Sequence, residues 1–305
     1  MTSVFAVAGS LLALSLGTVP LSITTIDVEA GKHSVNGSAA QGINDRGDVV
    51  GFTRDKDVNV YPYLVRKGVV TFLKAPASWG VVGEFWAGAA PRSINASGDI
   101  AGGYYLADGT VFGFLRSHHG KWTRLDVPGA EGATDAHGIN GPGEIVGNYS
   151  DDGWNSWSGF LFRPGHHGAP GSYLSIDYPD PGADGTQTWG INDDGDVVGF
   201  YDNWSLGTTH GFLLHEGDFT TIDVPGAQGT IAVAINSRGE ITGHFWTADG
   251  GYHGYLLSKG TYTTFDVPGA TMTAPMSIND HGEMVGFYFD AVGMAHGFKA
   301  VKAHH

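Results

Sequence analysis

Acid–base chemistry in this chain would rest on a small set of side chains. His137 could act as a general base and Glu84 as a general acid, because these side-chain types exchange protons in enzymes. Arg92 could hold a carboxylate or a developing negative charge. Glu84 and Asp135 could instead be the two carboxylates that glycoside hydrolysis generally needs. The chain has no Gly-x-Ser-x-Gly elbow and no zinc motif, so esterase and metalloprotease activities have no motif support.

Tryptophans lie beside acidic residues in several glycine-rich segments. Indole rings stack on the C–H faces of sugars, and carboxylates accept hydrogen bonds from hydroxyl groups. This pattern favours a carbohydrate-like ligand, although each indole could instead fill a gap between structural elements. The groupings are Trp79 and Trp86 with Glu84, Trp154 and Trp157 with Asp151 and Asp152, Trp204 with Asp202, and Trp246 with Asp249.

Metal ligation is a weaker interpretation of the same sequence. The run Asn192-Asp-Asp-Gly-Asp196 resembles a calcium loop, but equivalent turns contain Ser-Arg or Gly-Pro at its centre, and a hairpin explains them all. The pairs His118-His119 and His166-His167 are poor zinc sites, because adjacent side chains on a strand point to opposite faces. We therefore expect no metal and no cofactor.

The elements that would position these residues come from an internal repeat. Ile-Asn-x-x-Gly-(Asp/Glu)-hydrophobic recurs at intervals of 43 to 52 residues, with its asparagines at Asn44, Asn95, Asn140, Asn192, Asn236 and Asn279. Runs of alternating polarity follow, then His-Gly-Phe-Leu or a relative, then Thr-Ile-Asp-Val-Pro-Gly-Ala or a relative. Asn-x-x-Gly and Pro-Gly are turn signals, and the runs between them have strand period. Four strands per repeat of this length are typical of a β-propeller.

The two ends of the chain match different parts of one repeat. Ile23–Val28 matches the outermost strand, and His296–Ala300 matches the third strand. The sequence therefore predicts an all-β, six-bladed propeller over residues 22–303, closed when the N-terminal strand completes the last blade. Closure would remove exposed sheet edges. An open solenoid is the alternative, but it would not need matching ends.

Aligning the repeats separates scaffold from candidate site. Residues that recur, such as the asparagines and His210, His253 and His296, are expected to be structural. The informative position lies two residues before each motif isoleucine, on the innermost strand near the axis. A mixed ring there suits a small-molecule site, or is uneven filling of the channel mouth. Its members are Gln41, Arg92, His137, Trp189, Val233 and Met276.

Composition excludes several classes of partner. The net charge is −15, with 31 acidic against 16 basic residues, so the cationic surface that nucleic acids need is missing. Cysteine is absent, which excludes disulfides and thiolate chemistry.

Residues 4–19 are apolar and uncharged, so residues 1–21 resemble a secretory signal. Interruption by Gly, Ser and Pro20 argues against a membrane span, and we expect none in the mature chain.

A family resemblance can be stated from these motifs. The repeated Gly-Ile-Asn-x-x-Gly-x-Val-Gly, the His-Gly-Phe-Leu and the Asp-x-Pro-Gly-Ala resemble the bacterial extracellular repeats called the HAF family, from about residue 22 onward. At the namesake position this chain reads His-Gly-Phe. The resemblance implies a propeller-like protein that is secreted, periplasmic or at the cell surface, and it implies no reaction.

Three functions remain open from the sequence. The first is a monomeric secreted module that binds a small-molecule or glycan ligand. The second is an extracellular hydrolase or lyase that acts on a polysaccharide or similar polymer through His137, Glu84 and Arg92. The third is a structural or protein-interaction propeller. The residues expected to bind a ligand are Gln41, Arg92, Asp135, His137, Trp189, Trp86, Trp154, Trp204 and Trp246.

Overall fold

The computed structural model describes residues 16–17, 21–29, 35–55, 59–80, 88–130, 132–153, 156–165 and 170–302. This part of the chain consists of β-strands, turns and one short 3₁₀ helix, η1 (Ala77–Trp79). The predicted all-β class is confirmed. Among the described residues, no helix has the length and apolar character needed to cross a membrane.

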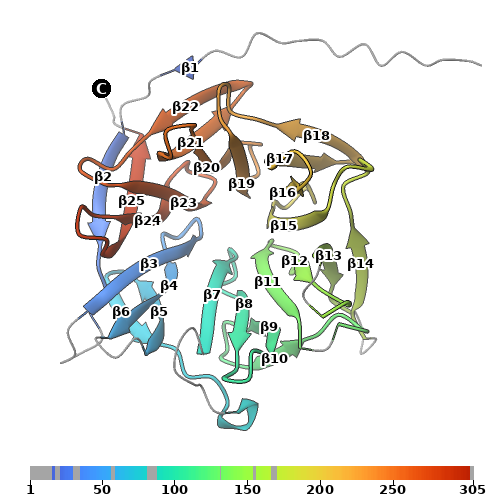
Figure 1. The fold of residues 1–305 in the computed structure, drawn as a ribbon. Helices are drawn as coiled ribbons and strands as arrows, with labels where there is room; N and C mark the ends of the chain where they lie inside the picture. The colour runs from blue at the N-terminus through green and yellow to red at the C-terminus, as the bar shows by residue number, and fades with distance from the viewer. Residues whose placement is uncertain are drawn as a thin grey trace, which may run out of the picture.

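The strands form antiparallel units of four, as the repeat predicts. Figure 1 shows the units arranged around a ring, with the first strand of each unit innermost. The units are β3 (Val35–Ile43), β4 (Val49–Asp55), β5 (Val60–Arg66) and β6 (Val69–Phe72); β7 (Gly88–Ile94), β8 (Ile100–Tyr105), β9 (Val111–Arg116) and β10 (Trp122–Leu125); β11 (Thr134–Ile139), β12 (Ile145–Tyr149), β13 (Ser158–Arg163) and β14 (Ser172–Ile176); β15 (Gly185–Ile191), β16 (Val197–Asn203), β17 (Thr208–His215) and β18 (Asp218–Ile222); β19 (Gly229–Ile235), β20 (Ile241–Trp246), β21 (Tyr252–Ser258) and β22 (Thr261–Phe265); and β23 (Met272–Ile278), β24 (Met284–Phe289) and β25 (Ala295–Lys302) with β2 (Leu21–Ile26).

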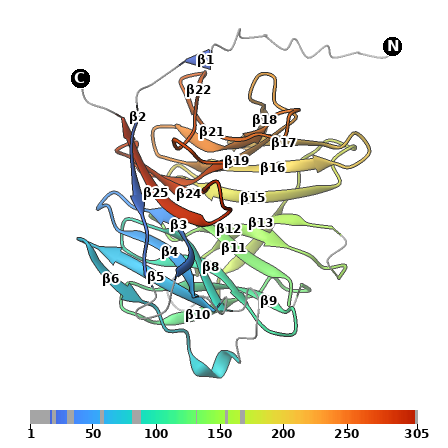
Figure 2. The same ribbon diagram turned by 60° about the vertical axis from the view of Figure 1, so that its left-hand side comes forward.

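The last unit takes its outer strand from the start of the chain. β2 pairs antiparallel with β25, from Leu21 opposite Lys302 to Ile26 opposite Gly297. Figure 2 shows β2 lying alongside β25. A further short strand, β1 (Leu16–Gly17), pairs in parallel with β22.

A buried aromatic residue packs each unit against its neighbours. On the third strand, this residue comes directly after the glycine of the His-Gly-Phe motif, or after the residue that replaces that glycine. Its side chain is fully buried in every unit. The hydrophobic clusters around these rings join strands of adjacent units, so the core lies mainly between units. The rings belong to Tyr63, Phe114, Phe160, Phe212, Tyr255 and Phe298.

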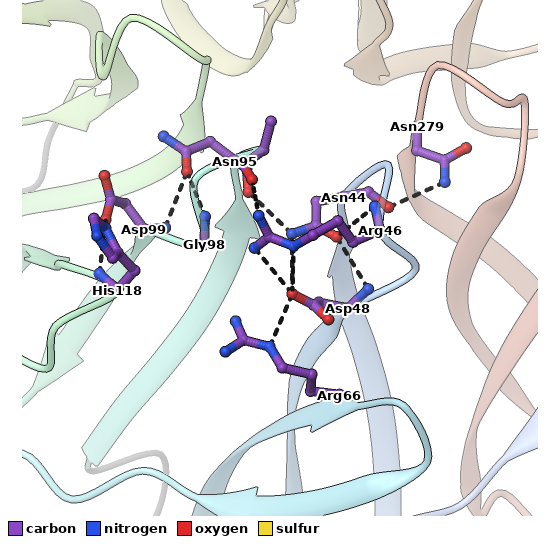
Figure 3. A network of polar contacts seen from close by, with 10 residues as sticks. Asn44, Arg46, Asp48, Arg66, Asn95, Gly98, Asp99, His118 and Asn279 are labelled. Carbon is purple, nitrogen blue, oxygen red and sulfur yellow. Dashed lines mark hydrogen bonds and ion pairs between the residues drawn. The ribbon is translucent and has the colours of Figure 1, made fainter.

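The motif asparagines do more than form turns. The Oδ1 atom of Asn44 accepts hydrogen bonds from the backbone N–H groups of Arg46 and Asp48, at 3.1 and 3.0 Å. Its Nδ2 atom donates to the backbone carbonyl of Asn95, 3.0 Å away in the next unit (Figure 3). The same interunit bond recurs from Asn95 through Asn140, Asn192, Asn236 and Asn279, and Asn279 donates to the carbonyl of Asn44 at 3.1 Å. Side-chain amides therefore tie the turns into a continuous ring.

The recurrent histidines are bound to aspartates that directly follow the outer strands. The Nδ1 atoms of His210 and His253 lie 2.9 Å from carboxylate oxygens of Asp223 and Asp266. In the last unit, His296 Nδ1 lies 2.9 Å from Asp27, directly after β2, and its Nε2 lies 3.3 Å from Asp290. The outer strand is thus held by an imidazole–carboxylate pair in each of these three units.

Removing one amide of the asparagine ring should destabilise the whole domain. Asn140→Ala removes bonds to the Glu144 backbone N–H and side chain and to the Asn192 carbonyl. We expect a loss of about 2–4 kcal/mol in the free energy of unfolding, because buried partners lose their hydrogen bonds. Urea denaturation measures it. Asn140→Asp should lose at least as much, because its carboxylate would face the Glu144 carboxylate and the Asn192 carbonyl where the amide now donates. A change in Asn140→Ala below about 0.5 kcal/mol would contradict the role given to the asparagine amides.

The His296 pair should make stability depend on pH. Its hydrogen bond to Asp27 is the main cause that raises the pKa of His296 above its ordinary value. Protonated His296 therefore stabilises the fold below about pH 6.5, and this contribution is lost as pH rises through the folded-state pKa. We expect the Tm difference between the native chain and His296→Gln to shrink between mildly acidic and alkaline buffers. A difference that does not change with pH would refute this.

Candidate ligand site in the axial channel

The ring positions coincide with bulges in the innermost strands. Each inner strand shows a register shift against its second strand at the ring residue, such as between Ala136 and Gly138 on β11. A bulge inserts an unpaired residue and re-aims its side chain. Opposite this bulge stands Gly147, where a Cβ would lie 2.1 Å from the Asp135 carbonyl oxygen, so glycine is required there. The equivalent shifts occur at Gln41, Arg92, Trp189, Val233 and Met276.

A collar of isoleucines divides the axial channel into two cavities. One, of about 80 Å³, lies among the asparagine turns. The other, of about 90 Å³, is lined by the ring residues Arg92, His137, Trp189, Val233 and Met276. The residues shared by both linings are Ile43, Ile94, Ile139, Ile191, Ile235 and Ile278. The second cavity is the candidate site, because its lining differs most from unit to unit.

Four polar side chains from two units meet beside this cavity. Arg92 donates to the Tyr105 hydroxyl at 2.9 Å and lies 3.6 Å from Asp135 Oδ2. The Tyr105 hydroxyl in turn donates to the same Asp135 oxygen. His137 Nε2 is 3.2 Å from that oxygen but is not aligned for a hydrogen bond. The guanidinium, phenol, carboxylate and imidazole therefore form one compact polar cluster.

An indole from the next unit completes the cluster. The ring of Trp189 meets that of His137 edge-to-face, with centroids 4.3 Å apart. The guanidinium of Arg92 lies 6.0 Å from the Trp189 ring centroid, the outer range of a cation–π contact. The site is thus built by β7, β8, β11 and β15, from three consecutive units.

Burial and charge fix the protonation of the cluster. Burial acts to raise the pKa of Asp135, but His137, Arg92 and the Tyr105 hydroxyl outweigh it and lower the pKa to about 2. Burial lowers the pKa of His137 more than Asp135 raises it. At neutral pH, Asp135 is therefore ionised against a charged Arg92, and His137 is neutral, with one ring nitrogen able to donate and the other able to accept.

Several buried polar atoms of this site have no hydrogen-bond partner among the described residues. The donors are Arg92 Nε and Trp189 Nε1, and the acceptors are Asp135 Oδ1 and the nearby Gln41 Oε1. Both ring nitrogens of His137 are also without a partner. Arg92, His137 and Trp189 line the cavity, whereas Asp135 and Gln41 do not. Buried polar groups normally have partners, so the unpaired atoms of the three lining residues indicate a place for a polar ligand or water.

The structure brings together only some of the residues predicted from sequence. Arg92, Asp135, His137 and Trp189 form the cluster, whereas Gln41 is buried nearby without lining the cavity. Trp204 and Trp246 also do not line it. Trp204 is 61% exposed in the β16–β17 loop, and Trp246 stacks on Tyr252, with centroids 5.8 Å apart. Glu84, Trp86 and Trp154 lie outside the described residues.

Tyr105 was missed by the sequence analysis. It ends the second strand of its unit, a position that the analysis did not align. A signal was available, because equivalent positions are as varied as those of the ring: Arg54, Tyr105, Ser150, Asp202, Trp246 and Phe289.

Comparison with known proteins identifies the fold class. No family model and no curated protein matches the chain. Among solved structures, a catalytically inactive virginiamycin B lyase from Staphylococcus aureus with quinupristin has a TM-score of 0.50 and 11% identity, over 92% of this chain and 99% of that chain. Aleuria aurantia lectin in complex with Fucα1-6GlcNAc also has a TM-score of 0.50 and 11% identity, over 85% and 91%. TolB from Acinetobacter baumannii has a TM-score of 0.56 and 11% identity, over 88% and 65%.

These similarities show a β-propeller fold and, at such identities, the fold alone. The resemblance to HAF repeats is supported by no family model and stays a prediction.

The cluster predicts a strong coupling between Arg92 and Asp135. Asp135→Asn should destabilise the fold by up to about 3–5 kcal/mol, because it leaves a buried guanidinium without its counter-charge. The double variant Arg92→Gln/Asp135→Asn should lose less than the sum of the two single losses. Denaturant unfolding of the four proteins measures the coupling. Strict additivity would show that the pair does not interact as described.

Proposed function

We propose that the chain is a secreted, closed six-bladed β-propeller that binds a polyhydroxylated or carbohydrate-like ligand through the axial cavity, from the face that carries the second-to-third-strand loops. The pairing of β2 with β25 and the ring of asparagine amides support closure. The apolar residues 1–21 and the HAF-like motifs support secretion. The proposed mature protein is a monomer of residues 22–303, without a metal or nucleic-acid partner.

The observation that carries the proposal is the mixture of unpaired groups in the site. Arg92 Nε and Trp189 Nε1 can only donate, whereas one ring nitrogen of neutral His137 can only accept. A carboxylate ligand would satisfy the donors and repel Asp135, and an ammonium ligand would do the reverse. A hydroxyl group both donates and accepts, so neighbouring hydroxyls of a polyol satisfy both kinds.

Cavity size limits how much of the ligand enters. Water occupies about 30 Å³ in the liquid, so a cavity of about 90 Å³ holds roughly three non-hydrogen atoms. That is one hydroxymethyl or vicinal diol group, not a sugar ring. The rest of the ligand would lie over the loops, where exposed Trp204 offers a stacking surface on one side.

One of the similar solved structures shows that a propeller fold can bind a sugar. The Aleuria aurantia lectin was solved with a fucosylated disaccharide, so a propeller of similar architecture binds a sugar. No residue of the present site is transferred from that protein, because the identity is 11%. The support for a hydroxylated ligand comes from the unpaired atoms described above.

A glycan array followed by calorimetry tests the proposal. We expect one class of polyhydroxylated ligand to bind, and Trp189→Phe to weaken it about tenfold, because an unpaired buried partner costs about 1–3 kcal/mol. This variant keeps an aromatic ring and removes the indole N–H together with part of the bicyclic ring that packs on His137. Trp204→Phe is the matched control on the rim and should change affinity less. No binding to any glycan or polyol, or weakening by Trp204→Phe alone, would contradict an axial site.

Catalysis is the second candidate, and one contact favours it. Neutral His137 lines the cavity with both ring nitrogens unpaired, and its Nε2 lies 3.2 Å from the Asp135 carboxylate, close enough for a small rotation of the ring to form the hydrogen bond that orients a general base. In this case the chain would be a hydrolase or lyase acting on an extracellular polymer. Product analysis of the array ligands distinguishes the two functions: turnover that is lost in His137→Ala would favour the enzyme, whereas binding without turnover would favour the binding protein.

A further inference from the structure

A second surface shares no lining residue with the axial site and lies between unit β11–β14 and unit β15–β18. Figure 1 shows these two units side by side. It is a groove of about 440 Å³ on the face that carries the Asn-x-x-Gly turns. Its apolar lining consists of Leu161, Leu174, Ile176, Val197 and Leu214. Its acidic lining consists of Glu144, Asp193, Asp194, Asp196 and Glu216. The volume is within the range of ligand-binding pockets.

Leu174 breaks the pattern of the outer strands at this groove. It pairs with Leu161 on the third strand and is 55% exposed. The same register position in every other unit is threonine, as Thr220 opposite Leu213 illustrates. The equivalents are Thr24, Thr71, Thr123, Thr220 and Thr263. Threonine suits an exposed strand surface, so leucine here adds apolar surface that packing within the unit does not require.

Asp194 departs from the repeat in charge. Arg46 stands at the equivalent turn position of the first unit and pairs with Asp48 at 3.1 Å, where Arg66 also binds (Figure 3). Arg238 and Glu240 repeat this pairing in the fifth unit. In the fourth unit the arginine is replaced by Asp194, and Asp196 has only His215 as an ionic partner among the described residues. The turn that neutralises its acid in the first and fifth units here adds a second acid.

Glu216 reverses a charge in the same way. It occupies the turn between β17 and β18 with a φ of 49°, a left-handed conformation. Lys67 and Lys259 occupy the same turn position in other units, at 49° and 50°. Within the described residues, the side chains of Asp194 and Glu216 form no hydrogen bond or ion pair. Arg163, the guanidinium that lines the groove, is paired with Glu144 at 3.0 Å.

We infer that this groove docks a basic, amphipathic peptide segment of a partner protein. An apolar side chain of that segment would cover Leu174 and Leu214, and flanking lysine or arginine residues would lie against Asp194 and Glu216. Charge complementarity selects this occupant, because an exposed leucine and two acids that replace the cations of other units line one groove. The net charge of −15 would favour encounter with a cationic partner.

The inference is tested by fluorescence anisotropy with labelled peptides and the full chain. The probes are an alternating Leu-Lys peptide, a Ser-Lys peptide that lacks the apolar side chains, and a Leu-Glu peptide that reverses the charge. Leu-Lys should bind more tightly than Ser-Lys, Leu-Glu should not bind, and affinity should fall with added salt. Equal binding of Leu-Lys and Ser-Lys, or no binding of either, would overturn the inference.

The chain itself supplies variants that should fold. Asp194→Arg, Glu216→Lys and Leu174→Thr each install the residue found at the equivalent place in another unit. Each charge reversal should weaken Leu-Lys binding at least about threefold, and Leu174→Thr should weaken it by a similar factor. Asp249→Arg makes the same charge change in the β20–β21 loop and should have little effect. Equal weakening by Asp249→Arg would show non-specific attraction and overturn the site.

Discussion

The arrangement of the units depends on one repeated contact, the asparagine amide that bonds across to the next unit's turn. Each amide accepts hydrogen bonds within its own turn and donates one to the backbone carbonyl of the next unit's asparagine. The end of every inner strand is therefore tied to the end of the next inner strand around the axis. The isoleucine before each asparagine is thereby held in the collar, and the residue two places earlier lies at the bulge. The position of the candidate site follows from this ring.

The repeat explains why the fold could be predicted and the site only partly. Turn residues and strand period act locally, so the alternation between Asn44 and Asn279 was enough to predict four strands per unit. The residues two places before each motif isoleucine were found by aligning the repeats, and the structure gathers three of them, Arg92, His137 and Trp189, at one cavity. The bulges that aim them were not foreseen, because a register shift depends on the partner strand.

Contacts between units were beyond a repeat-by-repeat analysis. Tyr105 reaches Asp135 from the preceding unit, and no pattern within one repeat predicts how two units are offset. Trp246 is a tryptophan, as expected for a sugar-stacking residue, but its ring is stacked on Tyr252 across the β20–β21 loop. Such packing depends on the neighbouring strand, which the repeat alignment did not consider. Departures from the repeat were nevertheless the most informative signal, at the axial ring and again at Leu174 and Asp194.

The central claim is that the departures at the axis form a binding site, and its most direct test follows individual indoles. The native chain is titrated with its best glycan ligand while the indole N–H resonances are recorded by NMR. We predict that the Trp189 resonance shifts with the same affinity as the calorimetric signal, while Trp79, packed among core aromatic rings, stays unchanged. Saturable binding that leaves the Trp189 resonance unmoved would contradict the account.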